Sequence, residues 1–144
     1  MTSVTTTAQI GNARFQNALI RRAQPTPPIW LMRQAGRYHG HYQALRAKHS
    51  FMDLCKQPEL AAEVARWPVL DFGFDAAILF SDLLFPLEAL GIGLEYTDQG
   101  PQLAWKLDEN SISCLRSVDD AWPHLLFRAK QCARLASEFL PIAV

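Results

Sequence analysis

Two short segments of the chain are apolar on both faces, and this feature limits the possible folds most. Residues 29–32, Ile-Trp-Leu-Met, and the centre of residues 74–82, Ala-Ala-Ile-Leu-Phe, lack the alternation of a half-exposed strand. Such runs are typical of strands that are buried from both sides, as in a parallel sheet covered by helices. Stretches of helical composition lie before, between and after them. This order predicts α/β units built on a parallel sheet.

The expected helices flank these two strands. Asn12 precedes a helix of about three turns, which ends before Pro25. Residues 41–50 have helical composition. A longer helix opens at Pro58, with a kink or a break expected at Pro68 and an end at Gly73.

The last third of the chain departs from the α/β pattern. In residues 91–107, alternating apolar residues flank the turn sequence Asp-Gln-Gly-Pro and predict a hairpin or an extended excursion. Asp119 and Asp120 are expected to cap a helix over residues 121–140. Residues 140–144 resemble the opening of a third buried strand.

Composition excludes several classes of function. The 14 basic side chains balance the 14 acidic ones, so no broad basic surface would attract nucleic acid or an anionic membrane. The apolar runs are far shorter than the roughly 20 residues that span a bilayer. Residues 1–11 lack the features of a secretory signal and are expected to form a flexible tail. Three cysteines without a Cys-X-X-Cys pair suit a reducing cytoplasm.

Charged residues follow both predicted strands. Arg33 and Arg37 come after the first, and Asp82 ends the second. The carboxyl ends of parallel strands share one edge, so these side chains would converge there. Because a guanidinium matches carboxylate or phosphate, the pair is interpreted as a clamp for a dianionic or polyanionic ligand. The alternatives are surface arginines paired with aspartates, and Asp82 as a helix cap or turn residue.

Other candidate sites are weaker. His39 and His41 have the spacing of metal ligands, but no nearby Cys or Asp completes a set, so no metal site is expected. The Gly-Ile-Gly at 91–93 lacks the third glycine of a dinucleotide fingerprint. The four tryptophans are expected to pack in the core or the hairpin: Trp30, Trp67, Trp105 and Trp122.

Five ordered segments resemble the N-terminal part of the uroporphyrinogen decarboxylase family. They are PIWLMRQAGRY, FMDLCKQPELAAEV, FGFDAAILFSDLL, PLEALGIGLEY and GPQL. The similarity runs from about Asn12 to the last residue, and RQAGRY followed by FDAAILFSD is the most specific part. The resemblance implies a partial (β/α)8 TIM barrel over residues 12–144. This part would hold the first two to three βα units, an N-terminal helix and a hairpin excursion.

The resemblance also implies a function. Family members are lyases that remove CO2 from the four acetate side chains of uroporphyrinogen and give coproporphyrinogen in porphyrin and heme biosynthesis. They are cytoplasmic homodimers that use no metal or organic cofactor. Asp82 would face the pyrrole N–H groups as a catalytic residue, and Arg37 would bind substrate first and donate a proton second. The implied substrate-binding residues are Arg33, Gln34, Ala35, Gly36, Arg37 and Asp82.

Two departures from the family pattern shape the remaining expectations. His39, Gly40 and His41 stand where the family usually has Leu-Pro and an acidic residue, and a full barrel typically needs about 250 residues. The 144-residue chain is therefore expected to be inactive alone, and to aggregate or need a complementary fragment. The alternatives are a non-catalytic tetrapyrrole-binding module and a subunit-interaction fragment. A related methyltransferase would be expected to carry zinc ligands in place of RQAGRY.

Overall fold

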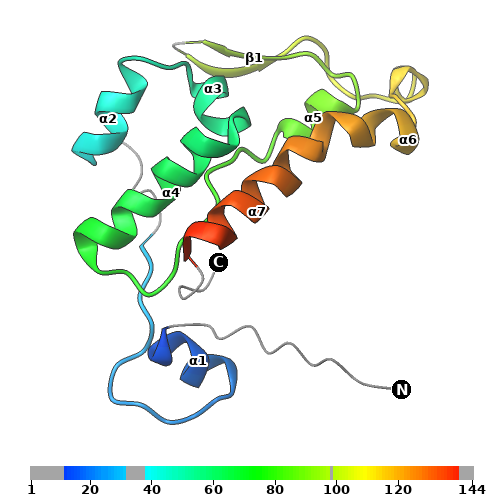
Figure 1. Ribbon diagram of the computed structural model, residues 1–144. Coiled ribbons are helices and arrows are strands. Elements are labelled where there is room, and N and C mark those ends of the chain that lie inside the picture. The colour runs from blue at the N-terminus through cyan, green and yellow to red at the C-terminus, as the bar shows by residue number, and fades with distance from the viewer. Residues whose placement is uncertain (1–11, 32–37, 98, 140–144) are drawn as a thin grey trace.

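Figure 1 shows the fold in a computed structural model, which describes residues 12–31, 38–97 and 99–139. This part of the chain is mostly helical and contains an antiparallel hairpin. Its elements in chain order are α1 (Ala13–Leu19), α2 (Gly40–Arg46), α3 (Phe51–Lys56), α4 (Pro58–Phe72), α5 (Phe85–Ala89), β1 (Leu94–Thr97), β2 (Gly100–Leu103), η1 (Ile112–Cys114), α6 (Val118–Ala121), η2 (Trp122–Leu125) and α7 (Leu126–Phe139).

Local capping sets the helix boundaries near the N-terminal half. The Asn12 side chain accepts a hydrogen bond from the Phe15 N–H at 2.9 Å, which confirms Asn12 as the cap of α1. Helix α3 begins with a capping box, in which Ser50 and Asp53 each bond the backbone N–H of the other. Gly73 ends α4 in the left-handed conformation at φ 65°, as predicted.

The break expected at Pro68 is not found. Helix α4 runs without interruption from Pro58 to Phe72, and Pro68 lies buried inside it. Because α4 packs along α7 (Figure 1), burial of this helix face outweighs the backbone hydrogen bond that a proline removes.

The predicted parallel strands are not formed in the described residues, and no barrel is present there. Residues 29–31 and 74–82 are irregular apart from an isolated bridge at Ala76. They are joined where the Asp75 N–H donates to the Ile29 carbonyl at 2.9 Å. The prediction was wrong here because such strands need hydrogen-bonding neighbours along both edges. The Met32 end of the first segment lies outside the described residues, as do residues 140–144.

The Asp75 side chain holds the same junction together. Its carboxylate is buried and accepts hydrogen bonds from the Ile29 N–H at 2.8 Å and the Asn12 amide at 2.9 Å. The Arg14 guanidinium forms an ion pair with it at 2.9 Å. Asp75 therefore ties α1 and residue 29 to the second segment.

The predicted hairpin is confirmed. Strands β1 and β2 pair antiparallel, with Leu94 opposite Leu103 and Thr97 opposite Gly100. Gly100 has φ 107°, a left-handed backbone conformation that favours glycine at this turn. In Figure 1 the hairpin lies beside the α3 end of the helices, away from α1.

The C-terminal helix differs in its start from the prediction. Ser117, and not Asp119 or Asp120, caps α6, because the Ser117 hydroxyl accepts the Asp120 N–H at 3.2 Å. The helical stretch then passes through the short 3-10 segment η2, which contains Pro123, before α7 begins.

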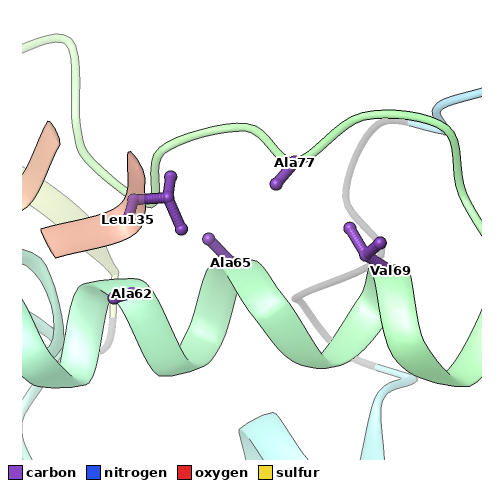
Figure 2. Close-up of a cluster of buried hydrophobic side chains, with 5 residues drawn as sticks. All are labelled: Ala62, Ala65, Val69, Ala77 and Leu135. Carbon is purple, nitrogen blue, oxygen red and sulfur yellow. The ribbon is translucent and has the colours of Figure 1, made fainter. Parts of the chain in front are cut away.

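Figure 2 shows the core between α4, α7 and the 74–82 segment. Small side chains on α4 let the other two elements approach closely, so Leu135 of α7 can be fully buried. The Gln131 side chain, also buried, donates a hydrogen bond to the Cys55 carbonyl and joins α7 to α3. The clustered residues are Ala62, Ala65, Val69, Ala77 and Leu135.

Several large apolar side chains lie outside this core. Trp30 and Trp122, which were expected to be packed, are exposed. Leu31 and Ile78, in the two segments predicted as strands, are about half exposed. Within the described ranges, no helix is long and apolar enough to cross a membrane.

Candidate active site

The predicted site residues divide between two parts of the chain. The loop residues Arg33, Gln34, Ala35, Gly36 and Arg37 lie outside the described residues, so their arrangement stays a prediction. Asp82 lies within the described part, at the end of the 74–82 segment and just before α5.

Asp82 is partly buried and held on one side. Its Oδ1 accepts a hydrogen bond from the Leu84 N–H at 2.7 Å. A hydrogen bond of this kind is expected if Asp82 is only a turn residue, which is the alternative role for it. It engages one oxygen, and a carboxylate has a second oxygen that can accept further bonds. A turn contact and a role in a site are therefore compatible.

The charge of Asp82 raises the pKa of two side chains that lie on other elements. Burial raises the pKa of the Cys55 thiol on α3 to about 12, and the nearby Asp82 carboxylate adds to that shift. The positive charges of Arg46 and Lys56 act in the opposite direction. A thiol in this state is not a nucleophile at neutral pH, so Cys55 is a buried packing residue.

Tyr96 on β1 is the second group. Burial raises the pKa of its phenol first, and the nearby Asp82 carboxylate raises it further. The phenol therefore stays protonated and is a hydrogen-bond donor at neutral pH. The charge of Asp82 thus acts on one side chain of α3 and one of β1.

An open groove of about 520 Å³ lies beside this cluster. It runs between α2, the start of α3 and β1, and its lining combines aromatic rings with a cation. The residues that matter here are Tyr42, Arg46, Phe51, Met52, Leu94 and Tyr96.

Two aromatic rings of the groove wall pack on Phe80, which precedes Asp82 by two residues. The ring of Tyr42 lies 5.6 Å from that of Phe80, and the ring of Phe51 lies 5.9 Å from it. Phe51 also contacts Tyr96, with ring centroids 4.7 Å apart. These contacts fix the surroundings of Asp82 through packing.

Sequence reasoning missed Arg46 as a site candidate. It lines the groove and acts electrostatically on both Tyr42 and Cys55. Its guanidinium donates to the His49 carbonyl at 2.7 Å. A single arginine in a helical segment carries no spacing signal, so only the fold could bring it to notice. The sequence did point to Tyr96, because the alternation in the predicted hairpin puts Tyr96 and Leu94 on the same face of the strand.

The two histidines after the predicted anion-binding loop pair with acids on α4. His39 Nε2 lies 2.7 Å from an Asp71 oxygen, and His41 Nε2 lies 2.8 Å from a Glu63 oxygen. The His41 ring also packs on Trp67, 4.4 Å between centroids. No group of three or more metal-ligating side chains occurs in the part of the chain that the structure describes. These histidines attach the segment after the loop to α4.

Comparison with known proteins gives a consistent result. The sequence profile of uroporphyrinogen decarboxylase (URO-D) matches residues 11–143. The chain is 56% identical over 90 residues to the uroporphyrinogen decarboxylase of Myxococcus xanthus, which covers 62% of this chain and 26% of that protein. It is 46% identical over 123 residues to the enzyme of the same name from Cereibacter sphaeroides, covering 84% of this chain and 36% of that protein. The chain thus spans about a quarter to a third of the length of these curated relatives. By these matches the chain belongs to the uroporphyrinogen decarboxylase family.

Proposed function

We propose that residues 12–144 are the N-terminal part of a uroporphyrinogen decarboxylase catalytic domain. The whole domain would remove CO2 from the four acetates of uroporphyrinogen to give coproporphyrinogen. The observation that carries this proposal is the family match over residues 11–143, which includes Arg33, Arg37 and Asp82.

In this proposal the substrate is held by its carboxylates. Arg33 and Arg37 bind them as guanidinium clamps, and the backbone of residues 34–36 lines the cleft. Arg46 is a further cation for the same ligand. Arg46 and Tyr96 line the same groove, and the charge of Asp82 raises the pKa of Tyr96. The groove therefore lies near Asp82, which supports this role for Arg46.

The chemistry needs an electron sink at the carbon that loses CO2. A pyrrole can serve as its own sink: when an acid protonates the ring carbon, the ring becomes cationic. The electrons of the broken C–C bond then flow into the ring as CO2 leaves. A proton adds to the freed methylene carbon to complete the new methyl group, and the ring carbon gives up the first proton, which restores the neutral pyrrole. This route uses no organic cofactor.

Asp82 is the residue that stabilises the cationic ring. A carboxylate facing the pyrrole N–H groups is worth more in the cationic transition state than in the ground state. The Leu84 N–H holds one oxygen of Asp82, which supports a fixed orientation of the group. Arg37 is a binding group first, because arginine gives up its proton only when its environment strongly disfavours the charge.

The proposal extends to the fold and assembly of the whole protein. Residues 29–32 and 74–82 would become neighbouring strands of a (β/α)8 barrel, and its further strands would cover Leu31 and Ile78. The exposure of these two side chains supports this arrangement. The assembled protein would be a cytoplasmic homodimer, and the 144-residue chain alone would be inactive.

Reconstitution tests this proposal. The chain is mixed with the part of the Cereibacter sphaeroides relative that follows its aligned region, and coproporphyrinogen is measured by chromatography after oxidation. We expect turnover in the mixture and none from either part alone. Arg37→Ala and Asp82→Asn should abolish it, whereas Lys106→Ala, which changes an exposed cation away from the groove, should not. A mixture that forms a stable complex without turnover would contradict the proposal.

The exposed apolar side chains also support a second candidate, a subunit-interaction fragment. Leu31 and Ile78 would then dock on a full-length decarboxylase without catalysis. Arg37→Ala discriminates between the two candidates. It should abolish porphyrinogen binding by a catalytic or tetrapyrrole-binding chain, and leave the docking of an interaction fragment unchanged.

A further inference from the structure

Two histidines at the start of α2 pair with acids on α4, and the proposed function gives these pairs no role. His39 Nε2 lies 2.7 Å from an Asp71 oxygen, and His41 Nε2 lies 2.8 Å from a Glu63 oxygen. A carboxylate only accepts hydrogen bonds, so each Nε2 carries a hydrogen and donates it. The His39 side chain is buried, so water competes little for its Nε2–H.

Helix α2 depends on contacts of this kind. It spans only the seven residues Gly40–Arg46, and none of them is buried. So short a helix is marginal by itself, and most helices are stabilised by packing of an apolar face. The cap residue His39 makes no side-chain capping bond, and its ring bonds Asp71 instead. The start of α2 is therefore set by contacts with α4 and not by a cap of its own.

The two pairs attach α2 at two separate points. The rings of His39 and His41 lie 6.3 Å apart, and each also packs on an aromatic ring of α4. The centroid distance is 5.6 Å from His39 to Phe72 and 4.4 Å from His41 to Trp67. A single contact would leave α2 free to turn about it, whereas two contacts fix its direction as well as its position.

The direction of α2 matters because this helix carries two side chains of the groove. Tyr42 and Arg46 both line the groove, and the Tyr42 ring packs on Phe80 with centroids 5.6 Å apart. Residues four apart lie on the same face of a helix, so Tyr42 and Arg46 move together when α2 turns. A turn of α2 would therefore move the Arg46 guanidinium relative to a carboxylate bound in the groove.

We propose that His39 and His41 are positioning residues for this groove. Their bonds to Asp71 and Glu63 hold α2 in the direction that places Arg46 on the ligand. The inference rests on the proposed function only for the identity of that ligand, a carboxylate of the substrate. The dependence of α2 on the two pairs can be measured without any turnover.

Replacing the two acids tests this dependence without changing α2 itself. The Glu63 and Asp71 side chains are partly exposed, and alanine is the best helix former, so Glu63→Ala and Asp71→Ala should leave α4 folded. Glu59→Ala is the matched control, because it removes an exposed acid from the same helix. All three variants lose one negative charge, so a difference between them reports the lost pair.

NMR of the tyrosine ring protons reports the position of α2. The chain has three tyrosines, and Tyr42→Phe assigns the signals of that ring. The ring current of Phe80 shifts the Tyr42 signals, so a displaced α2 should move them toward those of Tyr38, which is 90% exposed. The Tyr96 ring packs on Phe51 of α3 and should keep its signals, which separates a shift of α2 from a general loosening.

The outcomes of this measurement are distinct. We expect Glu63→Ala and Asp71→Ala each to move the Tyr42 signals, and Glu59→Ala to leave them in place. Tyr42 signals that stay in place in both variants would overturn the proposal. Equal movement of the Tyr42 and Tyr96 signals would also contradict it, because the pairs would then act on stability alone.

A conservative exchange on the α2 side adds a rescue. His41→Ala removes the donor and should move the Tyr42 signals as Glu63→Ala does. His41→Gln keeps an N–H donor and should restore them. The double change His41→Ala with Glu63→Ala should move them no further than either change alone, because both remove the same bond. Additive movements would show that the two side chains act separately. If His41→Ala does not fold, the acid variants decide the question.

Kinetics of the reconstituted protein test the effect on the ligand. We expect Glu63→Ala and Asp71→Ala to raise KM roughly twofold to tenfold, about the contribution of one hydrogen bond, with kcat nearly unchanged. This split is expected because α2 carries binding groups, whereas Asp82 lies on another segment. Glu59→Ala should keep the wild-type KM. Wild-type KM in both acid variants, or a fall in kcat at constant KM, would overturn the positioning role. Absence of wild-type turnover would instead count against the proposed function, and the NMR result would stand by itself.

Discussion

The α4 and α7 helices and the segments at 29–31 and 74–82 all present apolar side chains but differ in what they form. Helices α4 and α7 satisfy their backbone hydrogen bonds internally and bury a shared face. In the described residues the two segments are joined by hydrogen bonds at Asp75, and Leu31 and Ile78 are about half exposed.

The difference shows which interactions the described residues complete by themselves. A helix pair needs only its own two faces. A two-sided strand needs neighbours along both edges and a covering layer on each face. The hairpin lies between these cases, because β1 and β2 are close in sequence and pair with each other.

Among the changes that test this comparison, Leu135→Ala should have the largest effect on stability. Leu135 is fully buried between α4 and the 74–82 segment, and truncating such a side chain costs about 2–5 kcal/mol of unfolding free energy. Urea unfolding at neutral pH measures it. Leu83→Ala is the control, because Leu83 is 90% exposed and its truncation should cost less than about 0.5 kcal/mol. Equal effects of the two changes would mean that α4 and α7 do not form the main core.

Asp75→Ala should detach α1 from the rest of the chain, and it should lower the free energy of unfolding by less than Leu135→Ala can. It removes the acceptor for Asn12, Arg14 and the Ile29 N–H, and we expect a loss of about 2–3 kcal/mol. Limited proteolysis should then cut between residues 20 and 29 faster, while α4 and α7 keep their hydrogen-exchange protection. Loss of protection throughout would show that the junction and the core unfold as one unit.

The same carboxylate gives this junction a pH dependence. Burial alone would raise the pKa of Asp75, but the hydrogen bonds from Asn12 and Ile29 and the charge of Arg14 outweigh it, so the pKa lies below the ordinary 3.8. A lowered pKa contributes stability that is present above about pH 4 and is lost as the pH falls through the folded-state value. The stability difference between wild type and Asp75→Asn should therefore be constant near neutral pH and shrink in acid.

The sequence predicted those features whose signals are local. The Asn12 cap, the Gly73 end of α4 and the hairpin around Gly100 each follow from a few adjacent residues, and all are confirmed. The cap of α6 was misplaced by two residues, because Ser117 and Asp119 carry the same type of capping signal.

Features that depend on distant parts of the chain were not predicted, or were predicted wrongly. The uninterrupted helix at Pro68 depends on packing against α7, and the missing strands depend on neighbours that the described residues do not provide. At the site, Asp82 was predicted from its position at the end of the 74–82 segment, and its role stays a prediction. The groove beside Arg46 could not, since it joins residues that are some 50 positions apart.

Ser50→Ala should have the smallest effect on stability, and it tests a single helix cap. The Ser50 hydroxyl caps α3 by accepting the Asp53 N–H at 3.0 Å, and loss of such a cap costs about 1 kcal/mol. Ser113→Ala, which changes an exposed serine outside any cap, should cost less than about 0.5 kcal/mol. Because Phe51 begins α3 and packs on both Phe80 and Tyr96, fraying of this turn should also loosen the groove wall. We therefore expect the NMR signal of the Tyr96 ring to broaden in Ser50→Ala and not in Ser113→Ala. An unchanged signal would mean that the groove wall is held by the hairpin and the 74–82 segment without help from the cap.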